Sequence, residues 1–393
     1  MRAKILILTA GFGEGHNAAA HALAAACNAA QGDGSAKVVD AFALAAPRLN
    51  EVVRRGYLGL INRAPLVWRA AYSWLDRSSL APHLMRTLGR ERRALGRVIA
   101  AEQPVLLCST YPIYGYLLEG LAGDGFTLPP HYNVVTDSIT INSLWWRARC
   151  DGWFVPNEDS AGVMRQAGVA DRQLYVLGFP VNPRFAAAGA TLAPPDLASG
   201  APPRVLYIIN SVTSRAAQTA RRLLVDTEWE ITCTVGRNQR LGDELAELAR
   251  RRRAPARILG WTDEIPALLL THHAVVSKAG GATTQEALAA RCPMIVNQVV
   301  PGQEQGNCEL LLRHGIGARA ETPGKVIAEL SRAFRDNGAV WQQWRRALEP
   351  LSRPDAAHSI AAALFSHLAS MEEPIPVPFR IRAEYPMPRA SPA

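Results

Sequence analysis

The first glycine-rich turn of the chain contains a histidine that could take up a proton. It reads T-A-G-F-G-E-G-H-N from Thr9 to Asn17, between an apolar run and an alanine-rich stretch. Gly13 and Gly15 let the backbone approach a ligand closely, and the free N–H groups of a helix start favour an anion. We predict a ligand site here, with His16 as general base for a hydroxyl group. The alternative is a histidine that makes only a structural hydrogen bond.

A dinucleotide site is a second interpretation of this turn. Asp40 follows the next apolar run, where an acid that binds a ribose would lie. However, the glycine spacing is G-x-G-x-G and not G-x-G-x-x-G, so the glycine needed for helix packing is out of place. The spacing therefore disfavours a dinucleotide.

The second glycine-rich turn, S-K-A-G-G-A-T-T-Q-E from Ser277 to Glu286, has the residue types of a phosphate site. Backbone N–H groups and hydroxyls at a helix start can hold a diphosphate. The residues predicted to do so are Gly280, Gly281, Thr283 and Thr284. Glu286, one turn further, can accept hydrogen bonds from sugar hydroxyls. Lys278 could neighbour the diphosphate, although a solvated surface charge is the commoner fate of a single lysine.

Two further segments supply polar groups that suit sugar hydroxyls and phosphate. The loop P-G-Q-E-Q-G-N from Pro301 to Asn307 offers amides and a carboxylate suited to the hydroxyls of a hexose, namely Gln303, Glu304 and Asn307. Ser211 follows an apolar run and could bind phosphate through its hydroxyl. The six cysteines have no C-x-x-C pair and no His partner at metal-ligand spacing, so we expect no zinc site, and we predict no cofactor.

Alternating apolar runs and helical stretches predict the elements that position these turns. Runs at 5–9, 37–40, 105–109, 131–136 and 153–155 predict one parallel sheet, and runs at 205–209, 230–235, 257–259, 274–277 and 294–297 predict another. We therefore predict an α/β protein of two doubly wound parallel-sheet domains. We expect the N-terminal domain at 1–185, a linker rich in Ala, Gly and Pro at 186–203, the C-terminal domain at 204–354, a closing helix at 355–371 and a proline-rich tail at 372–393.

The composition excludes several classes of protein. A chain of 393 residues with 48% hydrophobic and 20% charged residues suits two globular domains and is unlike a disordered chain. No apolar run is long enough to cross a membrane, and we see no secretory signal. The six cysteines form no C-x-x-C pair, so we expect a reducing, cytoplasmic environment.

The net charge of +9 is concentrated in one segment, because residues 48–97 contain eleven arginines and three acidic residues. Aromatic and aliphatic residues between the arginines give the composition of a basic amphipathic helix on anionic lipid headgroups. The candidates to face the membrane are Arg54, Arg55, Tyr57, Trp68 and Arg69. The alternative is a solvated helical face packed on its own domain. Nucleic acid is a weaker alternative, because no recognised motif accompanies the charge, and we predict no such partner.

Six motifs in the same order make the chain resemble a known family. They are G-x-G-E-G-H-N-x-A-A in the first turn, V-V-T-D at Val134–Asp137, F-V-P-N-E at Phe154–Glu158, G-F-P-V-N-P-R-F at Gly178–Phe185, and K-A-G-G-x-T-x-x-E-A-L and P-G-Q-E-x-G-N in the second domain. Up to about Met371, the chain resembles the monogalactosyldiacylglycerol synthase and processive diacylglycerol glucosyltransferase group of glycosyltransferase family 28.

The resemblance implies a GT-B fold, in which two Rossmann-like domains face each other across a cleft. It implies an acceptor on the N-terminal half, a UDP-sugar on the C-terminal half, and inversion at the anomeric carbon without a bound metal. His16 matches the family's proposed base, Glu286 the position at the donor ribose, and Gln303, Glu304 and Asn307 those around the transferred sugar. The expected enzyme moves a hexose to a lipid such as diacylglycerol, and is cytoplasmic and peripherally bound to the anionic inner face of the cell membrane.

Two departures from the family pattern leave the substrates open. Asn142 stands where His is usual and Ser143 where Pro is usual, and an amide can position a hydroxyl but cannot take its proton at neutral pH. In addition, N-S-V-T-S at Asn210–Ser214 replaces a glycine-rich turn. Asp137 either caps the turn after its strand or orients His16 or the acceptor. The alternative functions are transfer to a non-lipid acceptor such as a secondary metabolite, and epimerisation of a UDP-sugar.

Overall fold

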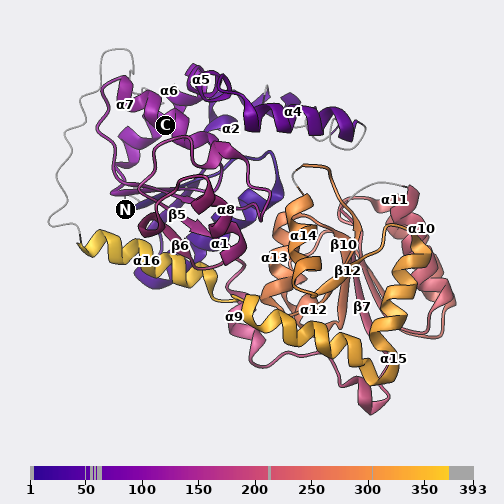
Figure 1. Cartoon of the computed structure of the whole chain (residues 1–393). Helices are drawn as coiled ribbons and strands as arrows, with labels where there is room; N and C mark the ends of the chain where they lie inside the picture. The colour runs from indigo at the N-terminus through magenta and orange to yellow at the C-terminus, as the bar shows by residue number, and fades with distance from the viewer. Residues whose placement is uncertain are drawn as a thin grey trace, which may run out of the picture. The chain divides into compact units, whose positions relative to one another are not determined.

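The computed structural model describes residues 4–48, 50–53, 56, 59, 64–210, 214–302 and 304–370. The chain divides into two compact units. The N-terminal unit contains the chain up to Asp137, Ile141–Pro180 and the chain from Ala356 onward, and the C-terminal unit contains Ser138–Thr140 and Val181–Asp355. Each unit has one parallel sheet with helices packed on it (Figure 1).

The N-terminal sheet has six parallel strands in the order β2-β1-β3-β4-β5-β6. The strands are β1 Ile5–Leu8, β2 Ala36–Val39, β3 Leu106–Ser109, β4 His131–Val134, β5 Gly152–Val155 and β6 Leu174–Val176. The four central strands are buried along their whole length, as expected for a parallel sheet with both faces covered. The strand order reverses between β1 and β3, and ligands of such sheets bind where the loops leave the strands at this point.

Alternate side chains of β1 pack on the two faces of this sheet. Leu6 and Leu8 lie in a core with α6 and α7, and Ile5 and Ile7 lie in a core with α1 and α16. The described helices of the unit include α1 Glu14–Gln31, α2 Ala41–Ala45, α4 Pro65–Arg77, α5 Ala81–Arg86, α6 Gly89–Glu102, α7 Ile113–Gly123, η1 Ser143–Trp145, α8 Glu158–Gln166, η2 Asp171–Gln173 and α16 Ala356–Ser370. The last described helix of the chain therefore completes the core of the N-terminal unit.

The C-terminal sheet also has six parallel strands, in the order β12-β11-β10-β7-β8-β9. The strands are β7 Arg204–Ile208, β8 Glu230–Thr234, β9 Ala256–Leu259, β10 Ala274–Lys278, β11 Met294–Gln298 and β12 Gly317–Arg319. The order reverses between β7 and β10. The second glycine-rich turn follows β10, so it leaves the sheet at the point where a doubly wound sheet binds ligands.

The helices of the C-terminal unit cover this sheet. They are α9 Arg184–Gly189, η3 Leu197–Ser199, α10 Ser214–Asp226, α11 Gln239–Arg251, α12 Ile265–Thr271, α13 Gly281–Ala289, α14 Gln305–Arg313, α15 Pro323–Leu348 and η4 Glu349–Leu351. The long α15 is kinked at 335–338, where Asp336, Asn337 and Gly338 have positive φ. Trp341 and Trp344, beyond the kink, are buried in the core.

The predicted fold class of two doubly wound parallel-sheet units is confirmed. The sequence did not indicate β6 and β12, which are edge strands of three residues each. Residues 186–203, expected as a linker, pack on the C-terminal unit, since Leu197 is buried in its core. The two units divide at Pro180 and Val181. The tail at 372–393 lies outside the described residues.

Candidate functional site

The first glycine-rich turn is braced by side chains from neighbouring segments. Asp40 accepts hydrogen bonds from the backbone N–H of Gly11 (2.9 Å) and from that of Ala43 (2.9 Å) at the start of α2. The hydroxyl of Tyr114 donates to the carbonyl of Thr9. Asp40 therefore holds the turn in place with both carboxylate oxygens, rather than presenting them to a ribose, and the dinucleotide interpretation loses its acidic residue.

His16 lies in the first turn of α1 and is 9% exposed. Its Nδ1 is 2.7 Å from the carbonyl oxygen of Thr110 and 2.9 Å from the hydroxyl oxygen of Thr136. The ring of Tyr111 meets the imidazole edge-on at 5.0 Å. Burial lowers the pKa of His16 to about 4, so the imidazole is neutral near pH 7 and able to accept a proton.

The two predicted acceptor-side glycines flank this histidine. A Cβ added to Gly13 would lie 3.6 Å from Cδ2 and 4.0 Å from Nε2 of His16. A side chain at this position would therefore begin beside the free edge of the imidazole. Gly15 lies next to His16 in the first turn of α1.

The loop after β4 contains Asp137 and Asn142, the other two candidates in this unit. Asp137 accepts a hydrogen bond from the indole Nε1 of Trp145 (2.8 Å), and burial raises its pKa to about 6 against the opposing effect of that bond. Asn142 caps η1 by accepting from the N–H of Leu144 (3.1 Å), and its side chain is buried. Thr136, the neighbour of Asp137, contacts His16. The side-chain oxygen of Asn142 is occupied by the cap.

Ser143, the second departure from the family pattern, connects this loop to α4. Its N–H donates to Oδ1 of Asp76 (2.7 Å), and its hydroxyl donates to the carbonyl oxygen of the same residue. Arg147 donates to the carbonyls of Asp76 and Ser78, both at 2.8 Å. A proline at position 143 would have neither donor, so Ser143 holds the end of α4 in a way that the usual residue could not.

The second glycine-rich turn contains an ion pair that links two loops. Nζ of Lys278 lies 2.7 Å from Oε1 of Glu304, whose Oε2 accepts from the N–H of Val300 (2.9 Å). A Cβ on Gly280 would lie 3.9 Å from the Lys278 nitrogen. The ammonium group is therefore beside the predicted phosphate turn. Both oxygens of Glu304 are already hydrogen-bonded, so the sugar contact predicted for Glu304 would have to share them.

Asn307 ties the same two loops together, since its Nδ2 donates to the carbonyl of Ala279 (2.9 Å). Its Oδ1 is buried and has no hydrogen-bond partner among the described residues. Thr283 is partly exposed at the start of α13, as are Gly281 and, further along the helix, Glu286. Burial raises the pKa of Glu286 to about 7.

The prediction that the Thr284 hydroxyl binds phosphate needs a correction. Its side chain is fully buried, and its hydroxyl contacts the sulfur of Met294 at 3.9 Å. The reason is helical periodicity, because consecutive residues of a helix point about 100° apart and Thr284 faces the sheet. Ser211 and Gln303, the other predicted donor-binding residues, lie outside the described residues.

The described part of the basic segment includes three separate helices, α4, α5 and α6. On α6, Leu95 and Ile99 are buried, so this helix packs on its own domain as the alternative interpretation predicted. On α4, Trp68 is partly exposed and Arg69 is exposed. Arg54, Arg55 and Tyr57 lie outside the described residues. Four exposed apolar side chains lie on α4, on α5 and just before α5, and we call them the α4–α5 surface: Val67, Trp74, Leu80 and Leu84, with exposed fractions of 58%, 50%, 66% and 52%.

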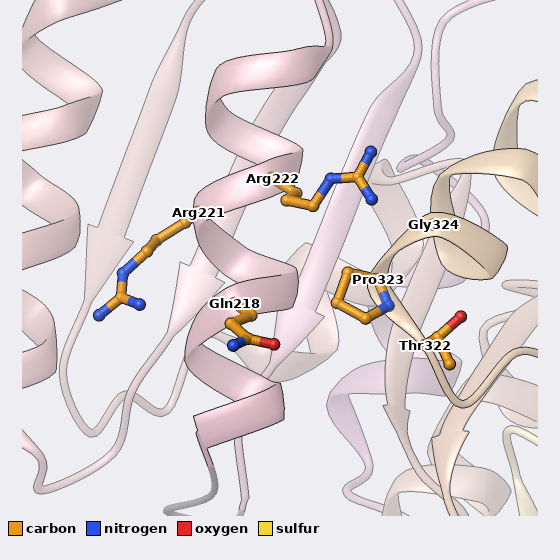
Figure 2. Close-up of a pocket in the computed structure, with 6 residues that line it drawn as sticks. All are labelled: Gln218, Arg221, Arg222, Thr322, Pro323 and Gly324. Carbon is orange, nitrogen blue, oxygen red and sulfur yellow. The ribbon is translucent and has the colours of Figure 1, made fainter.

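The C-terminal unit has a surface hollow whose lining includes none of the predicted donor-binding residues. Figure 2 shows it between α10 and the first turn of α15, lined by Gln218, Arg221, Arg222, Thr322, Pro323 and Gly324. Arg221 pairs with Glu244, and Arg222 pairs with Asp226 at 2.6 Å. Because both guanidinium groups already have carboxylate partners, we assign the hollow no role in the chemistry.

Comparisons with known proteins agree with the motifs. The family model described as monogalactosyldiacylglycerol (MGDG) synthase matches residues 16–181. A processive diacylglycerol beta-glucosyltransferase from Bacillus cereus (strain AH187) is 24% identical over 383 residues, covering 95% of this chain and 97% of the relative. A protein of the same description from Bacillus thuringiensis (strain Al Hakam) is 24% identical over 387 residues, with the same coverage of each chain.

The chain is a glycosyltransferase. The predicted resemblance to the MGDG synthase and processive diacylglycerol glucosyltransferase group is confirmed. Among solved structures, Os79 from O. sativa in complex with UDP has a TM-score of 0.62 at 12% identity, covering 93% of this chain and 99% of its own. MurG from Acinetobacter baumannii has a TM-score of 0.59 at 13% identity, covering 92% and 99%.

An epimerase shares the same fold. UDP-GlcNAc 2-epimerase from Neisseria meningitidis, bound to UDP-GlcNAc, has a TM-score of 0.56 at 11% identity, covering 92% of this glycosyltransferase and 99% of its own chain. At such low identities these likenesses establish the GT-B-like fold alone.

The sequence did not indicate how the candidate site is supported, since Asp40 was considered there only as a ribose ligand. Thr110 and Thr136 contact His16, and Asp40 braces its turn. All three follow β-strands of one parallel sheet, and loops at the carboxyl ends of neighbouring strands meet. That rule could have grouped these residues, but it could not have shown which atoms touch.

Proposed function

We propose that the protein is an inverting, metal-independent glycosyltransferase that moves a hexose from a UDP-sugar to a lipid acceptor such as diacylglycerol. The observation that carries the proposal is a neutral, buried His16 in the turn after β1, together with relatives described as diacylglycerol glucosyltransferases. In the proposed step, the acceptor hydroxyl gives its proton to His16 while its oxygen attacks the anomeric carbon. Attack from the side opposite the diphosphate inverts that carbon.

The turn after β10 would hold the departing UDP. The N–H groups at the start of α13 can bind the diphosphate, and Lys278 beside Gly280 brings a positive charge to the same turn. These groups could offset the charge that develops on the leaving group, a task that a divalent cation performs in other enzymes. Thr283 and Glu286 are the partly exposed residues of α13 placed to contact the nucleotide sugar.

We further propose that the α4–α5 surface docks on the anionic, cytoplasmic face of the cell membrane. Val67 and Trp74 are seven residues apart on α4 and therefore share one face of the helix, and Leu80 and Leu84 continue the exposed apolar surface. Arg69 and Arg77 are exposed on the same helix. Exposed apolar side chains and arginines on one helix suit the interface of an anionic bilayer. None of the described helices is long and apolar enough to cross a membrane.

Release of UDP by the purified full-length chain tests the substrates. UDP-glucose, UDP-galactose and UDP-N-acetylglucosamine are each supplied with and without diacylglycerol in anionic vesicles. The proposal expects release with one donor that depends on the lipid, persists in EDTA, and gives a product whose anomeric configuration is opposite to that of the donor. Lipid-independent release with a soluble acceptor would support the non-lipid alternative. Conversion of the UDP-sugar without any acceptor would support epimerisation, the activity named for a structure of similar fold.

Vesicle co-sedimentation tests the membrane surface. Trp74→Asp removes an apolar side chain from the α4–α5 surface and adds a negative charge, so we expect at least about a tenfold loss of bound protein on phosphatidylglycerol vesicles. High salt should weaken binding of the unmodified chain. Trp261→Asp is the matched control, because Trp261 is 76% exposed in the C-terminal unit. Equal binding of the two variants would refute this surface.

A further inference from the structure

Two oxygen atoms lie within hydrogen-bond distance of Nδ1 of His16, and one of them can only accept a hydrogen bond. The carbonyl oxygen of Thr110 lies 2.7 Å from Nδ1 and has no proton to donate. A neutral imidazole carries one proton, on Nδ1 or on Nε2. If the proton were on Nε2, the lone pair of Nδ1 would face the lone pairs of the carbonyl. The contact therefore requires a proton on Nδ1, which leaves the lone pair of Nε2 free.

The hydroxyl of Thr136 is the second oxygen at Nδ1, at 2.9 Å. With the proton already on Nδ1, this oxygen acts as a second acceptor for the same N–H. Thr136 is only 5% exposed, so little water competes for the contact. The hydroxyl of Thr110 in turn donates to the backbone carbonyl of His16 (3.0 Å), which fixes the start of α1 beside these groups.

We propose that Thr136 is a positioning residue for His16. Together with the carbonyl of Thr110, it holds the imidazole as the Nδ1–H tautomer and presents the lone pair of Nε2 as the base. The proposal rests on the proposed function. It gives the V-V-T-D motif a role through its threonine, whereas Asp137 is hydrogen-bonded to Trp145.

The two oxygens at Nδ1 also affect the state of His16 after the proton transfer. When the acceptor oxygen bonds to the anomeric carbon, its proton moves to Nε2, and the bond from that carbon to the UDP oxygen breaks with its electron pair leaving on UDP. His16 is then an imidazolium with a proton on each nitrogen. A hydrogen bond from a charged donor is stronger than one from a neutral donor, so both oxygens at Nδ1 stabilise this state more than the starting one.

The first test is nitrogen-15 NMR of the imidazole in the free, full-length protein. The signals of His16 are identified as those that disappear in His16→Ala. We expect a protonated Nδ1 and an unprotonated Nε2. In Thr136→Val, which keeps the volume and removes the oxygen, the tautomer persists through Thr110 but the Nδ1 proton resonance moves upfield. A proton on Nε2, or an Nδ1 proton that does not respond to Thr136→Val, overturns the proposal. Because no substrate is present, this test is independent of the proposed function.

The second test is steady-state kinetics on whichever donor and acceptor release UDP. Thr136→Val should lower kcat by roughly 3- to 10-fold, the loss expected for one hydrogen bond, with little change in KM for the UDP-sugar. Thr136→Ser should restore both kcat and the NMR signal. Thr127→Val is the matched control, since Thr127 is exposed in the loop before the amino end of β4, whereas Thr136 follows the carboxyl end of this strand. An unchanged kcat in Thr136→Val, or no rescue by serine, contradicts the proposal. Circular dichroism checks the fold, and Thr136→Ala replaces any variant that fails to fold.

Discussion

At the scale of single residues, the protein separates side chains that can do chemistry from side chains that hold them. His16 is buried and neutral, and threonine oxygens rather than a carboxylate surround its Nδ1. Lys278 is held beside the second glycine-rich turn by Glu304. In both places the side chain is held by partners from other loops, so the proposed site depends on the positions of those loops.

The buried state of His16 predicts an acid-sensitive contribution to stability. Its pKa is about 4 in the folded chain, below the usual 6.5 of an unfolded chain. The stabilising contribution is therefore full above pH 6.5 and declines as the pH falls towards 4, by roughly 3 kcal/mol in all. NMR titration of the ring should give a midpoint near pH 4, and a midpoint near 6.5 would contradict the burial.

The Lys278–Glu304 pair predicts coupled losses of stability. Glu304→Leu leaves the ammonium beside Gly280 without its partner, and Lys278→Met leaves a carboxylate that is 5% exposed without its cation. We expect each change to lower the free energy of unfolding by about 2 kcal/mol, and the double variant to lose clearly less than the sum. Denaturant unfolding measures the three values. Strict additivity would show that the two residues do not interact.

The sequence drew attention to the glycine-rich turns but not to the partners of their side chains. His16, Gly280 and Gly281 were recognised because glycine-rich turns before helices have a local signature. Thr284 was misplaced because its side chain faces the sheet, which depends on the register of α13. The contacts of Thr110 and Thr136 with His16 span 94 and 120 residues, and no local pattern encodes them.

At the scale of elements, the sequence predicted most strands but not the packing of the basic helices. Most strands were predictable, since apolar, β-branched runs mark buried parallel strands. β6 and β12 were missed because an edge strand of three residues has too little pattern. The basic segment looked like one amphipathic stretch, yet α6 packs in the core while α4 keeps exposed apolar side chains.

The attachment of α4 can be tested at Ser143. Ser143→Pro removes both hydrogen bonds to Asp76, whereas Ser143→Ala removes only the one from the hydroxyl. We expect trypsin to cleave the proline variant fastest at exposed Arg69 and Arg77, the alanine variant less fast, and the unmodified chain slowest. If all three are cleaved at one rate, these bonds do not hold the helix.

At the scale of the whole molecule, the chain returns to its first unit after completing its second. α16 begins after the C-terminal unit ends, yet Ile360 and Leu364 are buried against α1 and the first sheet. The sequence indicated a closing helix but not which sheet it covers, because that choice depends on packing between residues some 340 apart along the chain.

Leu364→Ala tests this closure. Removing a fully buried leucine should lower the stability of the N-terminal unit by about 3 kcal/mol. Ser366→Ala, at an exposed position of the same helix, is the control and should change stability by less than about 0.5 kcal/mol. Hydrogen exchange should show faster opening of β1 and β3 and unchanged protection of β7 and β8. Equal effects on both sheets would contradict the assignment of α16 to the first unit.

Proton transfer to His16 is tested most directly by the rate of lipid-dependent UDP release by His16→Ala beside the unmodified chain, both shown to be folded by circular dichroism. We predict that kcat falls by roughly 10²- to 10⁴-fold, the loss expected for a general base, while the affinity for the UDP-sugar changes little. A His16→Ala variant that releases UDP at nearly the original rate would contradict this prediction, because the proton of the acceptor would then leave by another route.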